Sequence, residues 1–574
     1  MSEFKGDVIM DKKAIPIGIS DFKSFNDKDY YYVDKTLMIK DIIDNKVLVT
    51  LFTRPRRFGK TLNLSMIKYF FEKTDEDNSY LFENLNIWNV GEKYRKHQGK
   101  YPVINLTFKD AKMNNWEETY EKLINIVAEE YKRHEYIEDI IKDRNDKQIF
   151  NNIKNRKASF SEYTSSIKKL CVYMEMYYKQ RPILLIDEYD VPLQNSYIQG
   201  FYNETINFIR SLLQEALKDN NSLEFAVITG CLRISKESIF TGLNNLDINS
   251  ILDKQYSEHF GFTQSEVDEM IKYYELEKKR EEIKDWYDGY QFGAKDIYNP
   301  WSVLKCVKDM TINSEKRPEA YWVNTSGNDI VKKLIKNADE TVKNEIEILI
   351  NGGTIDKALN ASITYNELDE NIDNIWSMLF FTGYLTYTEE KREEGAVTSY
   401  YSLKIPNKEL YYIYEIVIKT WFDNNIKQRD FRELYQNILE GKDEEISDEI
   451  SSLLLENISF YDASESFYHG ILIGIFSKIG IYRVFSNLES GIGRSDIILE
   501  PTKLKKPAIV IEIKVASEIE QLEEKCNEAL KQIDTKNYDT YLRKRGFDNI
   551  IKYGIAFYSK RCLAKKKDKN LKID

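Results

Sequence analysis

The sequence predicts an α/β protein of several domains, and three observations support this. The chain has 574 residues, too many for one hydrophobic core, so roughly two to four domains are expected. In the N-terminal half, apolar segments of strand length alternate with helical segments, which is typical of a parallel sheet. A second series of strands and helices follows near the C-terminus. We therefore expect a parallel-sheet domain, intervening helical regions and a separate C-terminal α/β domain.

The first domain contains four candidate strands. They are 47–53, 103–108, 182–190 and 224–230, and the charged segment 115–180 between the second and third is mostly helical. After residue 255, helical segments surround three aromatic loops, WYDGYQF, YNPWSV and YWVNTSGN. Residues 328–455 are mainly helical, with one strand pair near GYLTYTEE and TSYYSLKIP. We expect a parallel-sheet core over 1–254, a helical lid over 255–345, a mainly helical linker region over 346–455 and a C-terminal domain over 456–574.

The C-terminal domain has the predicted order α-β-β-β-α-β. Its first helix carries Phe467, Ile471, Ile475 and Ile479 on one side. The remaining elements are strands at 481–487, 495–500 and 508–515, a helix at 517–534 and a strand at 550–558. The final basic run, SKRCLAKKKDKNLK, is a local basic patch of the kind that a basic channel would use, and the favoured alternative is a solvated, frayed tail.

Composition excludes several classes of protein. A formal net charge of -11 argues against a general basic coat for nucleic acid, although a local basic channel remains compatible with it. The five cysteines are scattered singly, so neither a zinc site nor a disulfide framework is indicated, and a cytoplasmic location is expected. No uncharged run approaches the roughly 18 residues that span a bilayer, so no membrane partner is expected.

A candidate phosphate-binding loop follows the first strand. TRPRRFGKT ends in Gly59, Lys60 and Thr61 and leads into a helix, where backbone N–H groups and the helix dipole favour phosphate. Lys60 would reach the β- and γ-phosphates of ATP, and Thr61 would hold Mg²⁺. The usual pattern has a glycine at the position of Arg54, so the loop departs from the standard form.

Two later strands end in residues that suit the same site. Asp187 would hold Mg²⁺ through water, and Glu188 would polarise the water that attacks ATP. Thr229 ends the next strand in a position that suits a sensor of the γ-phosphate. The alternative is an ordinary α/β turn with acids at the surface. Together with the loop, these residues favour nucleotide binding over that alternative.

Four basic residues are further candidates around the phosphates. Arg233 or Lys236 could stabilise charge on the γ-phosphate, within the subunit or across the interface of a homo-oligomer, or could form salt bridges unrelated to phosphate. Arg56 and Arg57 are either phosphate contacts or solvated loop charges.

The C-terminal domain places charged residues where a metal-dependent nuclease needs them. In AIVIEIKVA, Glu512 and Lys514 alternate with isoleucines and so share one face of a strand. Asp496 lies on the strand before it. Phosphodiester hydrolysis needs a divalent ion to activate water and neutralise phosphate charge, and Mg²⁺ prefers carboxylate oxygens. Asp496 and Glu512 would hold that ion, and Lys514 would orient the water or stabilise phosphorus. The alternative is an exposed strand face with a salt bridge.

Four other residues surround this candidate site. Glu465 and His469 share a helix face, so Glu465 could complete the metal shell. His469 could contact phosphate or the metal-bound water, although a lone histidine on an apolar helix is more often structural. Gln532 and Tyr538, at the end of the following helix, could position the nucleic-acid backbone.

These motifs resemble a known bacterial and archaeal group, the AAA-ATPase-like proteins whose C-terminus carries a PD-(D/E)XK nuclease-superfamily domain. The N-terminal resemblance is carried by PIGISDFKSF, YYVDKT, TRPRRFGKTLNLSM, LLIDEYDVPL, TGCLRISKESIFTGLNN and the three aromatic loops. ESFYHG, GRSDIIL and IVIEIKVA carry the C-terminal resemblance. In that family too, an arginine replaces the first P-loop glycine. The resemblance implies a P-loop NTPase (AAA-like) sheet with a helical lid, followed by a restriction-endonuclease-like domain.

The leading hypothesis is an ATPase that controls a Mg²⁺-dependent nuclease acting on DNA or RNA, with DNA the favoured partner. One alternative is a nucleotide-switched binding or signalling module whose C-terminal domain grips nucleic acid without cleaving it. Another is an ATPase with a purely structural C-terminal domain. The sequence does not choose the substrate, the mode of cutting or the physiological trigger.

Overall fold

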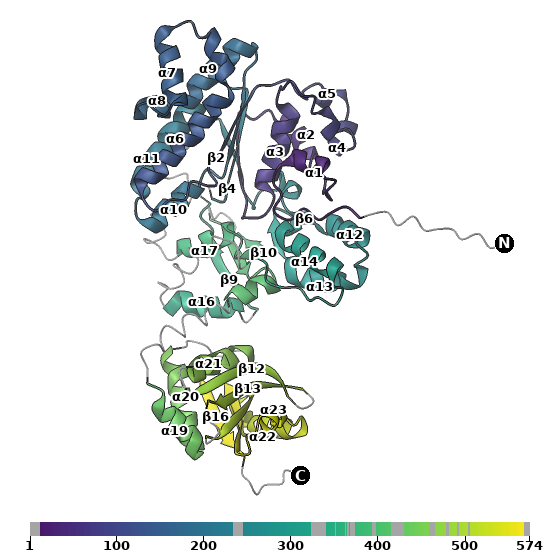
Figure 1. Cartoon of the computed structure of the whole chain (residues 1–574), viewed down its shortest axis with the longest axis vertical. Helices are drawn as coiled ribbons and strands as arrows, with labels where there is room; N and C mark the ends of the chain where they lie inside the picture. Colours follow the sequence, from purple (N-terminus) through teal and green to yellow (C-terminus); the bar gives the residue numbers. More distant parts are fainter. Residues whose placement is uncertain are drawn as a thin grey trace, which may run out of the picture. The chain divides into compact units, whose positions relative to one another are not determined.

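A computed structural model gives the arrangement of the chain (Figure 1). The chain forms two compact units, one made of Met1–Val331 and Thr354–Leu410, the other of Lys332–Gly353 and Tyr411–Asp574. The four-domain division remains a prediction. The structure describes residues 12–232, 245–322, 340–350, 352–361, 363, 365, 367, 373–392, 398–414, 430–457, 465–477, 481–490, 493–502 and 506–567.

The first unit is built on a five-stranded parallel sheet in the order β2-β3-β4-β1-β5. β1 and β3 are buried along their whole length, which explains their continuous apolar sequences. The predicted α/β parallel sheet is therefore confirmed. The strands are β1 Val49–Thr53, β2 Val103–Thr107, β3 Ile183–Asp187, β4 Phe225–Gly230 and β5 Leu246–Asn249.

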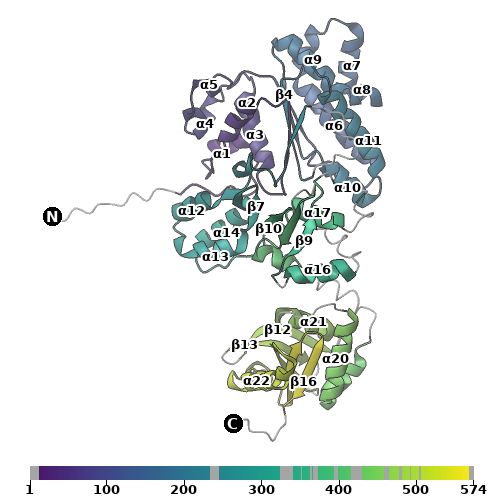
Figure 2. The ribbon, with the colours of Figure 1, turned by 180° about the vertical axis from the view of Figure 1, so that it is seen from behind.

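Helices cover both faces of this sheet, as the two opposite views show (Figures 1 and 2). One group lies on the first face: α1 Phe22–Asp27, α2 Leu37–Asn45, α3 Lys60–Phe71, α4 Asn86–Asn89 and α5 Glu92–Arg95. The other group comprises α6 Trp116–Arg133, α7 Arg144–Lys154, α8 Phe160–Thr164, α9 Ser166–Tyr178, α10 Val191–Gln199 and α11 Tyr202–Leu217. Asn115 caps α6 by accepting a hydrogen bond from the Glu118 N–H.

The region predicted as a helical lid combines helices with a small sheet. Its core is made by α12 Gln264–Tyr273, α13 Arg280–Tyr287 and α14 Pro300–Ile312. The sheet, in the order β6-β8-β7, contains β6 Phe262–Thr263, β7 Tyr290–Phe292 and β8 Lys295–Tyr298. WYDGYQF and YNPWSV, predicted as loops, therefore contain parts of α13, β7 and α14. Of their aromatic residues, Trp286, Tyr287 and Tyr298 pack in the core of the lid.

A second small sheet completes the described part of the first unit. It has the order β10-β11-β9, formed by β9 Ile355–Ala358, β10 Thr386–Lys391 and β11 Tyr400–Lys404, beside α17 Asp373–Phe381. The predicted strand pair is present, and β9 adds a third strand that its short, polar sequence did not reveal. No helix among the described residues is both long enough and apolar enough to cross a membrane.

The second unit contains a mixed sheet in the order β12-β13-β14-β15-β16. Only its β14–β15 pair is parallel. The strands are β12 Tyr482–Ser490, β13 Gly493–Pro501, β14 Ala508–Val515, β15 Ile550–Tyr558 and β16 Arg561–Lys566. The helices are α16 Glu340–Ile350, α19 Arg432–Glu440, α20 Asp443–Asn457, α21 Glu465–Ser477, α22 Leu522–Thr535 and α23 Thr540–Lys544.

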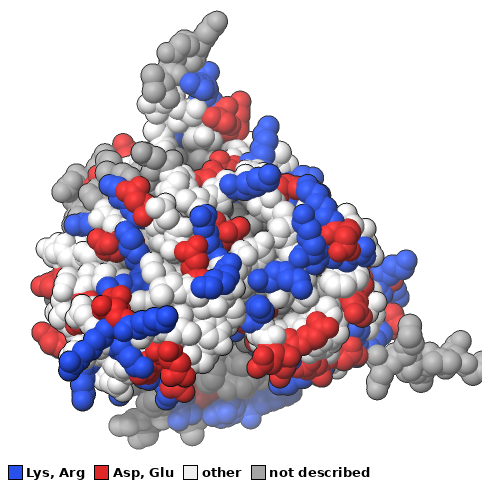
Figure 3. Space-filling model, turned by 90° about the horizontal axis from the view of Figure 1, so that it is seen from above, with Lys and Arg blue, Asp and Glu red and all other residues white. Residues whose placement is uncertain are grey.

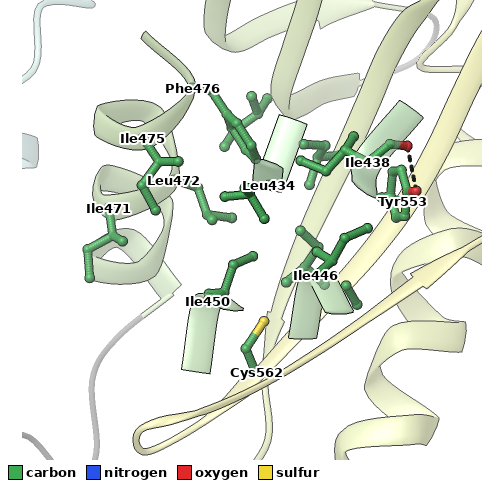
Figure 4. Close-up of a cluster of buried hydrophobic side chains, with 14 of the residues drawn as sticks. Leu434, Ile438, Ile446, Ile450, Ile471, Leu472, Ile475, Phe476, Tyr553 and Cys562 are labelled. Atoms are coloured by element: carbon green, nitrogen blue, oxygen red, sulfur yellow. Dashed lines mark hydrogen bonds between the residues drawn. The ribbon is translucent and has the colours of Figure 1, made fainter. Parts of the chain in front are cut away.

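Two sequence expectations for this unit need correction or extension. The prediction that the basic run is a solvated tail is wrong over Arg561–Lys566. These residues form the edge strand β16, which pairs with β15. Its Cys562 and Ala564 are buried, so the strand alternates apolar and polar residues. The core also takes in α19 and α20, whose Leu434, Ile446 and Ile450 belong to the same buried cluster as residues of α21 (Figure 4). The side chains of Phe467 and Ile479 lie outside the described set.

Candidate functional sites

The loop between β1 and α3 is shaped around the ammonium of Lys60. Lys60 is buried, and its Nζ donates hydrogen bonds to the carbonyl oxygens of Arg54 and Pro55, both at 2.9 Å. Gly59 precedes the helix with φ +87°, a left-handed conformation that suits glycine. The loop thus delivers a lysine, a hydroxyl residue and the start of a helix to one point, as phosphate binding requires.

β3 and β4 deliver a carboxylate and a second hydroxyl to the same point. Thr61 Oγ1 donates to Asp187 Oδ2 at 2.8 Å, and Thr229 Oγ1 donates to Asp187 Oδ1 at 2.6 Å. Burial raises the pKa of Asp187, while the two hydroxyl hydrogen bonds oppose that rise. A buried carboxylate facing a P-loop hydroxyl fits a magnesium–nucleotide complex, because the metal would supply the missing counter-charge.

A cavity of about 280 Å³ opens beside this cluster. Glu188, which has a positive φ of 51°, contributes to its wall next to Lys60 and Thr61. The residues that line the cavity include both basic side chains and apolar or aromatic ones. The basic residues are Arg56, Arg57, Lys109 and Lys112, and the apolar wall includes Tyr31, Phe262, Trp301 and Leu304. A phosphate chain and a flat base would therefore find matching surfaces.

Arg54, which stands where the usual loop has glycine, is completely buried. Its Nη1 donates to the carbonyl oxygens of Thr53 at 2.9 Å and Asn249 at 2.7 Å. The guanidinium also lies over the rings of Phe260 and Phe292, 4.9 and 5.5 Å from their centroids. Burial lowers the pKa of Arg54 to about 9. Its side chain joins the start of the loop to the end of β5.

The second site lies on one face of the C-terminal sheet, where β13 and β14 pair. Asp496 Oδ2 accepts a hydrogen bond from the Ile513 N–H at 2.8 Å, and the Asp496 N–H lies 3.4 Å from Glu512 Oε2. Lys514 Nζ is 3.6 Å from Glu512 Oε1. The isoleucines between them on β14 face the core of the unit. The strand alternation thus collects the three charged groups on the opposite face.

Glu512 is the most deeply buried member of this group, at 1% exposure. Burial and the charge of Asp496 raise its pKa to about 8, against the opposing effect of Lys514. The amide of Gln532, on α22, donates a hydrogen bond to Glu512 Oε1 and another to the hydroxyl of Tyr538 at 3.2 Å. Two repelling carboxylates held in place by neutral donors form a site that a cation would stabilise.

The helix α21 approaches the same group from the other side of β13. His469 Nε2 lies 2.8 Å from the carbonyl oxygen of Asp496, which makes it a positioning residue for that aspartate. Glu465 is exposed, and its Oε2 is 3.9 Å from Lys514 Nζ. Within the described part of the chain, no three His, Cys, Asp or Glu side chains gather as a metal cluster. Two carboxylates still suit Mg²⁺, which usually keeps several waters.

Comparison with known proteins finds a family for each of the two regions that carry these candidate sites. The family described as Predicted AAA-ATPase matches residues 16–240, and the PD-(D/E)XK nuclease superfamily matches residues 463–567. The chain joins an AAA-ATPase-like region to a PD-(D/E)XK nuclease-superfamily domain. The resemblance seen in the sequence is thereby confirmed, together with the predicted fold class.

One similar protein is the "Uncharacterized protein in vnfD 5'region" of Azotobacter chroococcum mcd 1. It is 28% identical over 318 residues, which cover 55% of this chain and 55% of that protein. The match thus spans little more than half the length of either chain.

The structure brings most of the predicted residues together within their own domains. In the AAA-ATPase-like region, Gly59, Lys60, Thr61, Asp187 and Thr229 meet, and Glu188 and Arg57 line the adjoining cavity. In the PD-(D/E)XK domain, Asp496, Glu512, Lys514, Gln532 and Tyr538 meet, and Glu465 lies at the edge of this group, beside Lys514. Arg233 and Lys236 lie outside the described residues.

Sequence reasoning missed several residues of the nucleotide region. Trp301 places its ring 4.2 Å from the guanidinium of Arg57, a contact between residues far apart in the chain. Lys109 and Lys112, in the loop after β2, also line the cavity. The available signal was the position of these lysines after a strand, since loops at the carboxyl ends of parallel strands meet at one edge of the sheet.

Asp190 is a further residue that sequence reasoning missed. It accepts hydrogen bonds from the Cys231 and Leu232 N–H groups, at 2.8 and 3.1 Å, and shapes the turn after β4.

Proposed function

We propose that this protein binds and hydrolyses ATP and thereby controls a Mg²⁺-dependent nuclease in its PD-(D/E)XK domain. The observation that carries the nuclease half is the meeting of Asp496, Glu512 and Lys514 on one face of the β13–β14 pair. Two carboxylates and one ammonium at hydrogen-bonding or near-contact distance match the needs of phosphodiester cleavage.

In the nuclease half, Asp496 and Glu512 are the residues that would hold Mg²⁺. The bound ion supplies activation of water and neutralisation of phosphate charge. Gln532 keeps the Glu512 carboxylate in place, and His469 does the same for the backbone of Asp496. Lys514 offers its ammonium to the phosphate or to the attacking water, with Glu465 at the edge of the site.

In the ATPase half, Gly59 and Lys60 bind the phosphates, and Thr61 and Asp187 are the residues that would hold Mg²⁺. The metal–nucleotide complex supplies the phosphoryl group whose transfer to water changes the state of the protein. Glu188 orients that water. Thr229 holds Asp187 and reports on the γ-phosphate, and Arg57 and Arg233 are candidates for contacts with phosphate.

We further propose that the substrate is DNA and that the protein acts in the cytoplasm. The face shown in Figure 3 mixes Lys and Arg with Asp and Glu, in keeping with the net charge of -11. With this net charge, we expect nucleic acid to be bound locally at the nuclease site. All five cysteines are buried free thiols, which suits a reducing compartment.

The test is a cleavage panel on the purified full chain. Plasmid, linear duplex, single-stranded DNA and RNA are incubated with Mg²⁺ or Mn²⁺, with and without ATP. We expect Asp496→Ala to abolish cleavage while retaining ATP binding, and Lys60→Ala to abolish ATP binding. Cleavage that persists in Asp496→Ala would overturn the nuclease assignment. Tight DNA binding without strand breaks in any metal would instead favour the nucleotide-switched binding module.

A further inference from the structure

A buried carboxylate, Glu409, connects two of the aromatic motifs of the sequence. Its Oε1 and Oε2 accept hydrogen bonds from Ser302 Oγ, at 3.0 and 2.8 Å. Oε1 also accepts one from the Trp322 N–H at 2.8 Å. Ser302 belongs to YNPWSV and Trp322 to YWVNTSGN. We refer to Glu409, Ser302 and Trp322 as the Glu409 cluster.

The members of this cluster cannot move independently at low cost. Glu409 and Ser302 are both 0% exposed, and Trp322 is 3% exposed. Burial raises the pKa of Glu409 to about 7, and the hydrogen bonds from Trp322 and Ser302 limit the rise. A buried carboxylate that loses its donors keeps the cost of desolvation without compensation. Displacement of one partner therefore favours displacement of the others.

One end of the cluster belongs to the wall of the nucleotide cavity. Ser302 follows Trp301 in the first turn of α14, and the Asn299 side chain caps both residues through their N–H groups. The Trp301 ring lies 4.2 Å from the guanidinium of Arg57 in the P-loop, and both residues line the cavity. A ligand that moves Trp301 therefore also moves Ser302.

The other end lies where the chain passes between the two compact units. The first unit ends at Leu410, directly after Glu409, and the helical segment 408–414 continues across this boundary. The segment before Glu409 is held against the lid: Asn407 Nδ2 donates to the Asp288 carbonyl at 2.9 Å. At Gly289, which has φ +102°, an added Cβ would lie 2.2 Å from the Pro406 carbonyl oxygen, so only glycine permits this approach.

We propose that Glu409 is a positioning residue that transmits nucleotide occupancy from the α14 wall of the cavity to the helical segment 408–414, where the chain enters the nuclease-bearing unit. This inference rests on the proposed function, since it concerns how ATP controls cleavage. The Glu409 cluster is the connecting element, because one carboxylate ties the cavity wall to the helical segment 408–414.

The first test compares cleavage rates with and without ATP in the full chain. In the wild type we expect ATP to change the rate about fivefold or more, the lower end of ordinary coupling between two sites. In Glu409→Ala and Ser302→Ala that ratio falls to about one, while cleavage without ATP is unchanged, because the coupling element is gone. Glu409→Gln keeps an acceptor and the side-chain shape, so it retains much of the coupling. Lys408→Ala is the matched control, since it removes only an exposed ion pair with Asp285.

The second test does not depend on cleavage. Hydrogen exchange by mass spectrometry follows the described helical segment 408–414 with and without ATP. We expect ATP to alter exchange there in the wild type and in Lys408→Ala, but not in Ser302→Ala. Unchanged ATP dependence in both Ser302→Ala and Glu409→Ala overturns the inference. The inference is also overturned if bound ATP changes neither cleavage nor hydrogen exchange in the wild type. Cleavage that depends on Asp496 would in that case still support the nuclease. A chain that binds no ATP overturns both this inference and the ATPase half.

Discussion

Replacing Glu409 by glutamine should change how the stability of the first unit depends on pH. The carboxyl group has an ordinary pKa of 4.5 in an unfolded chain, and burial raises the native pKa to about 7. Between these values the native state keeps a proton that the unfolded state has released. Raising the pH through this range therefore destabilises the wild type, and the loss is complete above pH 7.

The structure sets the size of this effect. A rise in pKa from 4.5 to about 7 corresponds to about 3 kcal/mol of stability lost between pH 4.5 and pH 7. Cys306 and Tyr287 do not titrate in this window, because burial raises the pKa of Cys306 to about 12 and lifts that of Tyr287 further above its ordinary value. Glutamine has no proton to release, so Glu409→Gln lacks this contribution.

The assay is a series of thermal unfolding scans of both proteins from pH 5 to pH 8, followed by calorimetry. All other titrating groups are shared, so the difference between the two proteins isolates residue 409. We expect the variant to gain on the wild type by about 3 kcal/mol across this range, a shift of a few degrees in a unit of this size. A difference that stays flat from pH 5 to pH 8 would refute the buried, hydrogen-bonded carboxylate.

Three further predictions concern the two sites. Arg54→Gly restores the usual P-loop glycine yet should weaken ATP binding by about tenfold or more, because two hydrogen bonds from a charged donor are lost. Calorimetric titration measures the affinity for ATP, and an affinity equal to that of the wild type would contradict the prediction. Arg494→Ala should raise KM for DNA cleavage, since β13 places residue 494 on the same sheet face as Asp496. The control is Arg483→Ala, which should leave KM unchanged. Arg483 is exposed and pairs in register with Glu500, farther along the strand from Asp496. His469→Ala should reduce Mg²⁺ affinity or activity about 10–100-fold through loss of the Asp496 contact, and a metal titration of cleavage with no change would exclude that role.

Some features of this protein could be predicted because they depend on local sequence. The strand ends at Thr53, Asp187 and Gly230 follow from short apolar runs, and parallel strands deliver their carboxyl ends to one edge. Likewise the two-residue period of β14 fixes Glu512 and Lys514 on one face, whatever surrounds them. These local rules were sufficient to predict most of the residues in the two candidate sites.

Other features depend on contacts between distant residues and could not be predicted. Arg561–Lys566 was predicted as part of a charged tail. It is a strand because it pairs with β15, and this pairing cannot be seen in its own sequence. The sequence left two roles open for His469, a contact with phosphate or metal-bound water and a structural contact. The structure places its Nε2 beside the carbonyl oxygen of Asp496, which is a structural contact. Arg54 and Trp301 gain their roles from Asn249 and Arg57, which neither spacing nor composition indicates.

The amino-acid sequence by itself determined that a P-loop, two strand-end acids and a carboxylate–lysine strand exist, because turn chemistry and strand period act over a few neighbouring residues. Only the tertiary structure decided which carboxylates are buried, what holds them and what they connect. Burial and partners are properties of packing, and packing joins residues as far apart as Ser302 and Glu409.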